Sequence, residues 1–200
     1  MASLPIVDDN FLSEEEIERY KKYFLGHPSK IRWAFMPKTS ISNKKYSPEI
    51  ESKVYESGSF THFLMWEKSP NMNGHGSEEA LEILSKFSEK HGIQVGEIIR
   101  SKVNLTTRAS SEDSQKFYSP HVDIDYKHFG FIYYLNDSDG DTVFFNKRYP
   151  ESSLQESDSK EVIRISPKAG RAILFDGLQY HAGSPCVNTD FRALINIDFK

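Results

Sequence analysis

Two histidines and one aspartate combine the residue types and the spacing of a metal site. His121 and Asp123 are separated by one residue, and His181 follows much later in the chain. Since alternate residues of a β-strand share one face, a strand over residues 120–125 would present His121 and Asp123 together. Two histidines and one carboxylate form the facial triad of non-haem Fe(II) oxygenases, which leaves coordination positions open. Zinc is the alternative metal, because the same ligands with a bound water suit a hydrolytic site.

Each of these residues also has an ordinary structural explanation. His121 fits a half-buried strand histidine and Asp123 fits a turn or cap residue, so the His-x-Asp pattern alone is weak. A metal site requires that the fold bring His181 to the other two. The remaining histidines fit ordinary roles or lack spaced partners, and we leave them out of the site; they are His27, His62, His75, His91 and His128.

An arginine on the last β segment is a candidate anion ligand. Arg192 stands between residues of one alternating apolar face, so its side chain is expected on the opposite face. That apolar face comprises Phe191, Ala193, Ile195, Ile197 and Phe199. A guanidinium in a barrel mouth is costly unless it meets an anion, and its planar fork suits a carboxylate. The residues therefore favour a dicarboxylate ligand, with a surface ion pair to Asp190 or Asp198 as the alternative.

The elements that must position these residues differ between the two parts of the chain. Ser13 and Glu16 form the pattern of a capping box, which predicts a helix from there to Leu25. Apolar residues at three- and four-residue steps predict a second helix that Ser77 caps and Gly92 ends. Short segments rich in β-branched and aromatic residues predict strands over 5–7, 94–105, 120–125, 129–135, 142–146, 161–165, 172–175, 179–182 and 190–199. We expect a mainly β fold with supporting helices, built around a jelly roll whose open mouth holds the site.

Composition limits the class of protein. The 200 residues predict a single domain over 1–200, with N-terminal strands and helices over 1–92 and the β core over 93–200. The sequence has one cysteine, no apolar run long enough to cross a membrane and no basic leader, so we expect a cytoplasmic protein without membrane contact. The net charge of −4 argues against a nucleic-acid partner. Composition does not predict the oligomeric state.

The order of several motifs resembles the Fe(II)- and 2-oxoglutarate-dependent dioxygenases, in particular their prolyl-4-hydroxylase-like branch, over roughly residues 94–200. The similarity begins with His121-Val122-Asp123. It continues with Phe-Ile-Tyr-Tyr-Leu-Asn at 131–136, Asp-Gly-Asp-Thr-Val-Phe-Phe at 139–145, Gly-Arg-Ala-Ile-Leu-Phe at 170–175, His181 and Arg192. Each element is common alone, but their joint order is not. This resemblance implies a double-stranded β-helix, which is a form of the jelly roll.

The resemblance also implies a role for each matching residue. His121, Asp123 and His181 would hold Fe(II), and Arg192 would bind the distal carboxylate of 2-oxoglutarate. Tyr134 would assist Arg192, whereas Tyr133 would face the other side of its strand. Thr142, Tyr118 and Asn104 are further candidates to line the pocket. Collagen-type prolyl hydroxylases usually carry lysine where this chain has Arg192, which leaves the subfamily open, and the intact Asp123 favours hydroxylation over halogenation.

The activity implied is hydroxylation coupled to oxidative decarboxylation of 2-oxoglutarate. The cofactors would be Fe(II), 2-oxoglutarate and O2, with ascorbate as a reductant. A prolyl or other residue in a peptide or protein is the preferred substrate, followed by a free amino acid or small metabolite and then a methylated nucleobase. The alternative from another class is a non-catalytic jelly-roll module that binds metal or ligand. Three polar segments, 36–59, 69–77 and 108–119, are candidate lids.

Overall fold

Two antiparallel sheets of unequal size form the centre of the protein. The computed structural model describes residues 5–39, 45–66 and 74–200, and within these residues the larger sheet has seven strands and the smaller has three. The larger sheet runs, in spatial order, through β1 (Ile6–Asp8), β8 (Ala172–Asp176), β5 (Phe129–Tyr134), β10 (Phe191–Phe199), β4 (Ile98–Thr107), β3 (Ser59–Trp66) and β2 (Ala34–Met36). The smaller sheet contains β7 (Glu161–Ile165), β6 (Thr142–Arg148) and β9 (Gln179–Gly183). The mainly β, jelly-roll fold is thereby confirmed.

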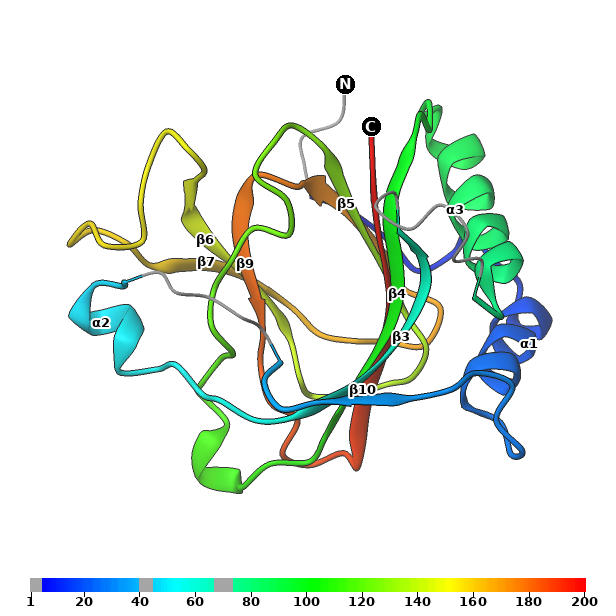
Figure 1. Cartoon of the computed structure of the whole chain (residues 1–200), viewed down its shortest axis with the longest axis horizontal. Helices are drawn as coiled ribbons and strands as arrows, with labels where there is room; N and C mark the ends of the chain where they lie inside the picture. Colours follow the sequence, from blue (N-terminus) through cyan, green and yellow to red (C-terminus); the bar gives the residue numbers. More distant parts are fainter. Residues whose placement is uncertain (1–4, 40–44, 67–73) are drawn as a thin grey trace.

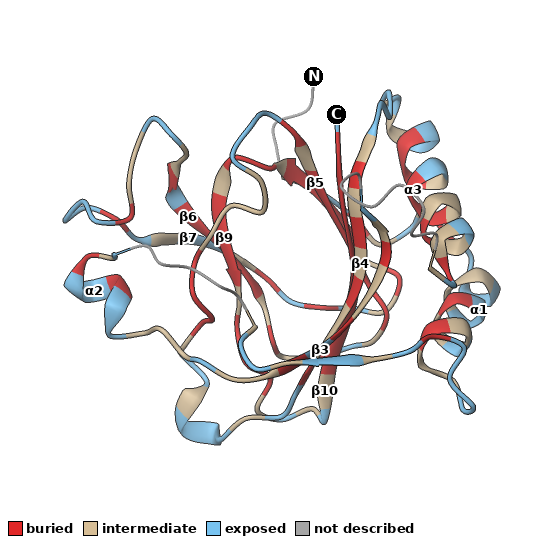
Figure 2. Cartoon of the chain, viewed as in Figure 1, coloured by how far each residue is buried: buried red, intermediate tan, exposed pale blue. Residues whose placement is uncertain are grey.

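The larger sheet is covered on both faces. The helices α1 (Glu14–Leu25) and α3 (Ser77–His91) lie along one face of it, and the smaller sheet lies on the other side (Figure 1). A short helix α2 (Pro48–Glu51) and a 3-10 turn, η1 (Ser111–Asp113), lie in the connections. A cluster of buried residues from β5, β6, β7, β8 and β10 joins the two sheets. Figure 2 shows burial concentrated in the strands and in the helix faces that meet them, with exposed residues on the outer helix faces.

Strands β4 and β10 separate two very different environments. On the outer face, Val103, Ile195 and Ile197 are fully buried in the core that α1 and α3 cover. On the inner face the residues are mostly polar, and the register pairs them across the two strands. These pairs are Arg100 with Asp198, Lys102 with Asn196, Asn104 with Leu194, and Thr106 with Arg192. The predicted alternation on the last strand is confirmed, and it directs Arg192 toward the smaller sheet.

The helix ends agree with the sequence except at the start of α3. Ser13 and Glu16 form the predicted capping box: the Ser13 N–H donates to the Glu16 carboxylate at 2.8 Å, and the Glu16 N–H donates to the Ser13 hydroxyl at 3.3 Å. The prediction that Ser77 caps α3 is wrong. Gly76 occupies the cap with φ +97°, a conformation that glycine adopts without strain, and the Ser77 hydroxyl donates instead to the carbonyl oxygens of Leu64 and Gly74.

Most predicted strands appear with bounds shifted by a few residues, but the one predicted over 120–125 is wrong. Of these residues only His121 pairs, in an isolated bridge with His181. Pro120 has no N–H to donate to a ladder, and the chain bends from residue 123 onward. The sequence predicted neither β3 nor the edge strand β2 that lies beside it. Within the described residues, no helix is long and apolar enough to span a membrane.

The aromatic contacts under α3 provide a test of this packing. Phe87 is fully buried, and its ring lies 5.4 Å from that of Phe11 and 5.2 Å from that of Phe131, between centroids. Phe87→Ala is expected to lower the free energy of unfolding by about 3–4 kcal/mol, because it leaves a cavity between helix and sheet. Urea denaturation measures the loss. Phe35, which is 63% exposed, is the matched control: Phe35→Ala should cost less than about 1 kcal/mol. Equal losses for the two variants would contradict the assigned packing.

Candidate metal and cosubstrate site

The fold brings His121, Asp123 and His181 together. His121 and Asp123 come from the segment between β4 and β5, whereas His181 is in β9 of the smaller sheet. One ligand atom from each residue can be chosen so that all three atoms lie within 4.8 Å of one another. Within residues 5–39, 45–66 and 74–200, this is the only group of three or more His, Cys, Asp or Glu side chains close enough to one another to hold a metal ion. The sequence prediction that these three residues meet is correct, although the strand expected to carry the first two does not form.

The backbone holds both imidazoles with the same nitrogen facing the cluster. The backbone N–H of His121 donates to the backbone carbonyl oxygen of His181 at 2.9 Å, and the backbone N–H of His181 donates to that of His121 at 3.0 Å. The Nδ1 atom of His121 lies 2.9 Å from the Ser119 carbonyl oxygen, and that of His181 lies 3.0 Å from the Gln179 carbonyl oxygen. A carbonyl only accepts, so both Nδ1 atoms carry the proton. The lone pairs of both Nε2 atoms are therefore free to bind a metal, as is typical of metal-binding histidines.

The charge state of the cluster also suits a cation. Burial, followed by repulsion from His181, lowers the pKa of His121 to about 4, so its imidazole is neutral at neutral pH. Burial by itself would raise the pKa of Asp123, but the charge of Arg100 outweighs it and holds that pKa well below its usual range. Neutral imidazoles and an ionised carboxylate are the forms that bind metals. No proton has to leave either group at neutral pH before a cation binds.

Charged and polar side chains behind the cluster contact Asp123. The Arg100 Nη2 atom lies 2.6 Å from Asp123 Oδ1 and 2.6 Å from Asp198 Oδ2, and Arg100 Nε donates to Asp198 at 2.9 Å. Asn196 Nδ2 donates to the other Asp123 oxygen at 3.3 Å. The Asp198 side chain is fully buried, and burial together with the negative charge of Asp123 raises its pKa to about 7. The sequence analysis missed Arg100 and Asn196, although their alternation with apolar residues on β4 and β10 is a signal that could have identified them.

Arg192 lies at the other end of the same pocket. It is 7% exposed, and its Nη2 atom donates to Thr142 Oγ1 at 2.8 Å. The Tyr134 hydroxyl lies 2.5 Å from the same Thr142 oxygen, so the three predicted residues are adjacent. Tyr133 points to the opposite face, where its ring packs against Phe11 and Tyr20. The expected difference between the two tyrosines is confirmed.

The alternative explanation of Arg192, a surface ion pair, is wrong. Asp190 pairs with Arg108 on the surface, and Asp198 pairs with Arg100 in the interior. The Arg192 Nε atom is buried without a hydrogen-bond partner among the described residues. A buried donor without a partner is costly, so this atom indicates a missing acceptor in the pocket. A carboxylate would supply that acceptor.

One narrow pocket, lined by both polar and apolar side chains, connects the His-Asp-His cluster with Arg192. It encloses about 80 Å³, and its lining includes the three candidate metal ligands and Arg192. The lining also contains residues that the sequence proposed for it and residues that the sequence missed. The former are Thr142, Tyr118 and Asn104, and the latter include Lys102, Thr106, Ile132, Leu194 and Asn196. The donor set and the buried guanidinium together fit a divalent metal ion with a dicarboxylate beside it.

Two of the candidate lids fall partly outside the described residues. Residues 40–44 of the segment 36–59, and residues 69–73 of the segment 69–77, are not described. Within the described parts, Thr39 and Ser59 line the pocket from the first segment, and Tyr118 lines it from the segment 108–119. These contacts place two of the three segments next to the site. They do not test whether either segment closes over it.

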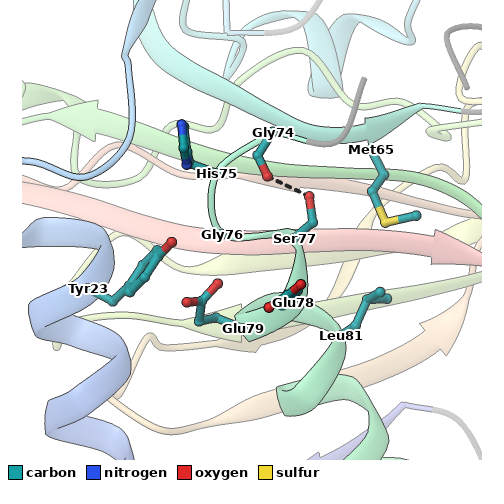
Figure 3. Close-up of a pocket in the computed structure, with 9 residues that line it drawn as sticks. All are labelled: Tyr23, Met65, Gly74, His75, Gly76, Ser77, Glu78, Glu79 and Leu81. Atoms are coloured by element: carbon teal, nitrogen blue, oxygen red, sulfur yellow. Dashed lines mark hydrogen bonds between the residues drawn. The ribbon is translucent and has the colours of Figure 1, made fainter. Parts of the chain in front are cut away.

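A larger hollow elsewhere lacks this chemistry. A cavity of about 420 Å³ lies at the start of α3, where Tyr23, His75, Glu78 and Glu79 line it (Figure 3). None of the predicted site residues faces it, and no group of three potential metal ligands occurs among its described residues. The size of a cavity alone does not identify the candidate site.

Comparison with known proteins agrees with this geometry. Residues 106–198 match the family model of the 2OG-Fe(II) oxygenase superfamily. This segment includes His121, Asp123, His181 and Arg192. The segment belongs to the 2OG-Fe(II) oxygenase superfamily. Membership of this superfamily implies Fe(II), 2-oxoglutarate and O2 as cofactor and cosubstrates. No curated protein matches the sequence of the chain significantly.

Solved structures share the fold at low sequence identity. A 2OG-Fe(II) oxygenase-family oxidoreductase from Burkholderia pseudomallei aligns with a TM-score of 0.65 and 14% identity, covering 98% of this chain and 84% of the other. A prolyl hydroxylase from Trichoplax adhaerens, in complex with a peptide fragment of the hypoxia inducible factor oxygen degradation domain, gives a TM-score of 0.57 and 15% identity, with coverage of 98% and 82%. The non-heme alpha-ketoglutarate-dependent epimerase SnoN from nogalamycin biosynthesis gives 0.60 and 12%, with coverage of 98% and 77%. At these identities the likeness shows the fold alone.

The contact between Arg100 and Asp123 generates a test of the metal site. Arg100→Met should weaken Fe(II) binding by about 10-fold or more, because Asp123 loses the partner that orients and ionises it. Anaerobic titration of the metal-free protein with Fe(II) measures this change. Arg148→Met is the matched control, since Arg148 pairs with Asp176 and Glu151 away from the site and its loss should leave Fe(II) affinity unchanged. Wild-type affinity in Arg100→Met would contradict the role of this ion pair.

Proposed function

We propose that this oxygenase is an Fe(II)- and 2-oxoglutarate-dependent hydroxylase of a residue in a peptide or protein, with a prolyl residue as the first candidate. The observation that carries the proposal is the presence, in one pocket between the two sheets, of a His-Asp-His cluster and a buried arginine. The cluster suits Fe(II), and the arginine suits the far carboxylate of a dicarboxylate. A hydrolytic zinc site would need no such arginine.

In this proposal His121, Asp123 and His181 hold the iron, and Arg192 binds the distal carboxylate of 2-oxoglutarate. Thr142 and Tyr134 position the guanidinium, because Thr142 Oγ1 accepts from Arg192 and lies against the Tyr134 hydroxyl. Burial raises the pKa of Tyr134, so this hydroxyl stays protonated and can donate. With iron bound, oxidative decarboxylation of 2-oxoglutarate to succinate and CO2 would supply two of the four electrons that reduce O2, and the C–H bond of the substrate would supply the other two. One oxygen atom would end in the new hydroxyl group and the other in succinate.

Apolar side chains lie against His181 in the cluster. Phe175 packs edge-on against the His181 ring, with ring centroids 4.8 Å apart. The centroid of the Phe144 ring lies 6.2 Å from that of His181. Ile132 and Leu194 add apolar surface to the pocket wall. Exclusion of water protects a strongly oxidising site from side reactions, which is the role that we assign to these side chains.

A peptide or protein substrate is supported by the surface next to the cluster. A groove of about 280 Å³ begins at His121 and Asp123 and extends across β4 and β3 to Met36 at the edge strand β2. The Trichoplax adhaerens prolyl hydroxylase, which shares this fold, is described in complex with a peptide. The similar fold of an epimerase favours a small-molecule substrate as the second candidate.

Succinate formation tests the proposed activity. Iron-loaded wild-type protein should convert 2-oxoglutarate to succinate when O2 is admitted, and a proline-containing peptide that is a substrate should raise the rate. Asp123→Ala should reduce succinate formation by at least about 100-fold, because the iron loses its only anionic protein ligand. Circular dichroism checks that the variant folds. Undiminished turnover in Asp123→Ala would contradict the assigned ligands, and metal binding without any succinate from wild type would favour a non-catalytic module.

Cosubstrate binding tests Arg192 separately. Arg192→Met should raise the Kd for 2-oxoglutarate by at least about 10-fold, since a charge-assisted hydrogen-bonding partner is removed from a buried site. Calorimetric titration of the Mn(II)-loaded protein under argon measures this constant without turnover. Arg108→Met is the control, because Arg108 pairs with Asp190 on the surface. Equal affinities in Arg192→Met and wild type would show that the dicarboxylate binds elsewhere.

A further inference from the structure

Lys102 is a cation beside the candidate metal ligands that the proposed function does not use. It lies on the inner face of β4, where the register sets it opposite Asn196 on β10 and Phe63 on β3. Its side chain lines both the inner pocket and the outer groove. Arg192 and Thr142, by contrast, line only the inner pocket. Lys102 therefore stands where the cosubstrate pocket opens toward the groove.

The other charges of the groove already have partners. Arg100 lies between Asp123 and Asp198, and Lys38 pairs with Glu56 at 2.8 Å on the surface. Lys102 makes no hydrogen bond or ion pair with any residue that the structure describes. Burial, followed by repulsion from Arg100, lowers its pKa, and the charges of Asp123 and Asp198 oppose this from a distance. Lys102 is half-buried, and an ammonium group that is partly shielded from water and has no carboxylate partner within hydrogen-bond distance favours an incoming anion.

The lining of the groove is rich in cations although the whole protein is acidic. The chain carries a net charge of −4, yet the groove lining contains three cations, Lys38, Arg100 and Lys102, and one carboxylate, that of Asp123. Hydroxyls of Thr39, Ser59 and Thr61 complete its polar wall. Because Lys38 is paired with Glu56, and Arg100 with Asp123 and Asp198, Lys102 is the cation of this lining that can attract an anionic ligand.

The cosubstrate has its own cation at a distance from Lys102. Thr106, which is the register partner of Arg192, is four residues from Lys102 along β4. At the rise of a strand, the backbone positions of Thr106 and Lys102 are about 13 Å apart. Two separate cations at the two ends of one site suit two ligands, with Arg192 serving the dicarboxylate. Lys102 then serves a group that enters through the groove.

We propose that the primary substrate of this site carries a carboxylate next to the atom that is oxidised, and that Lys102 binds this carboxylate. The inference rests on the proposed function, whose site it uses. The carboxylate can belong to an acidic residue beside the target residue of a peptide or to a free amino acid. Lys102 is thus a specificity-determining residue, and it does not hold the metal or 2-oxoglutarate.

Matched acid and amide probes test this role without turnover. The protein is loaded with Mn(II) and N-oxalylglycine, an inert analogue of 2-oxoglutarate, and the Kd of each probe is measured by NMR titration. One pair is acetyl-Glu-Pro-amide and acetyl-Gln-Pro-amide, and the other is free proline and its amide, prolinamide. Wild type should bind the acid of at least one pair about 10-fold more tightly than its amide. The pair that shows the preference distinguishes a peptide from a free amino acid.

Substitutions at two lysines of the groove identify the source of the preference. Lys102→Met should bind acid and amide equally, and Lys102→Arg should keep the preference. Lys38→Met is the matched control and should keep it as well, since Lys38 pairs with Glu56 on the surface. Each variant should keep the wild-type Kd for 2-oxoglutarate.

Three results would overturn the inference. The first is equal binding of acid and amide by wild type in both pairs. The second is a preference for the acid that survives in Lys102→Met. The third is a rise in the Kd for 2-oxoglutarate in Lys102→Met as large as that in Arg192→Met. The last would assign Lys102 to the cosubstrate. None of these results depends on succinate formation, so failure of the inference is distinguishable from failure of the proposed function.

Discussion

The burial of charge on the inner face of β4 and β10 is the constraint on which the rest of the structure depends. Arg100, Asp123 and Asp198 lie where an isolated charge would cost several kcal/mol. They are stable there because the guanidinium lies 2.6 Å from each carboxylate. Removal of Arg100 would leave the two carboxylates without the cation that compensates them. This network therefore requires the register that pairs Arg100 with Asp198 across the two strands.

Such a polar face needs an apolar one to stabilise the fold. The opposite faces of the same strands provide it, because Val103, Ile195 and Ile197 are fully buried beneath α1 and α3. Alternation along a strand puts these two environments one residue apart. The helices contribute stability from one side of the sheet, and the other side remains available for polar groups that a metal and its ligands require. In the jelly roll, one face of β4 and β10 thus contributes to the hydrophobic core, and the other face carries the residues of the site.

The arrangement also accounts for the readiness of the site to bind a cation. Nδ1 contacts to backbone carbonyls orient both imidazoles, and burial keeps His121 unprotonated at neutral pH. Arg100 keeps Asp123 ionised. At the far end, Arg192 contacts Thr142, yet its Nε atom has no acceptor among the described residues. The pocket is therefore complementary to a cation at one end and to an anion at the other, as the cofactors of the 2OG-Fe(II) oxygenase family require.

The sequence alone determined the features that depend on local order. The capping box at Ser13, the alternation that turns Arg192 inward and the opposite directions of Tyr133 and Tyr134 all follow from residues close together in the chain. The choice of His121, Asp123 and His181 followed from their types and from the order of motifs. For the same reason, the mainly β class and the jelly roll were predictable.

Only the tertiary structure decided the contacts that join distant segments. The backbone bridge to His181 positions His121 without the predicted strand, because Pro120 cannot donate and the chain bends after it. Likewise, the contacts of Ser77 with Leu64 and Gly74 leave the cap of α3 to Gly76. The union of Arg100 with Asp123 and Asp198, and the position of Lys102 in the groove, depend on strand register and on the approach of the smaller sheet. Such pairings join residues far apart in sequence, and no local pattern encodes which strands become neighbours.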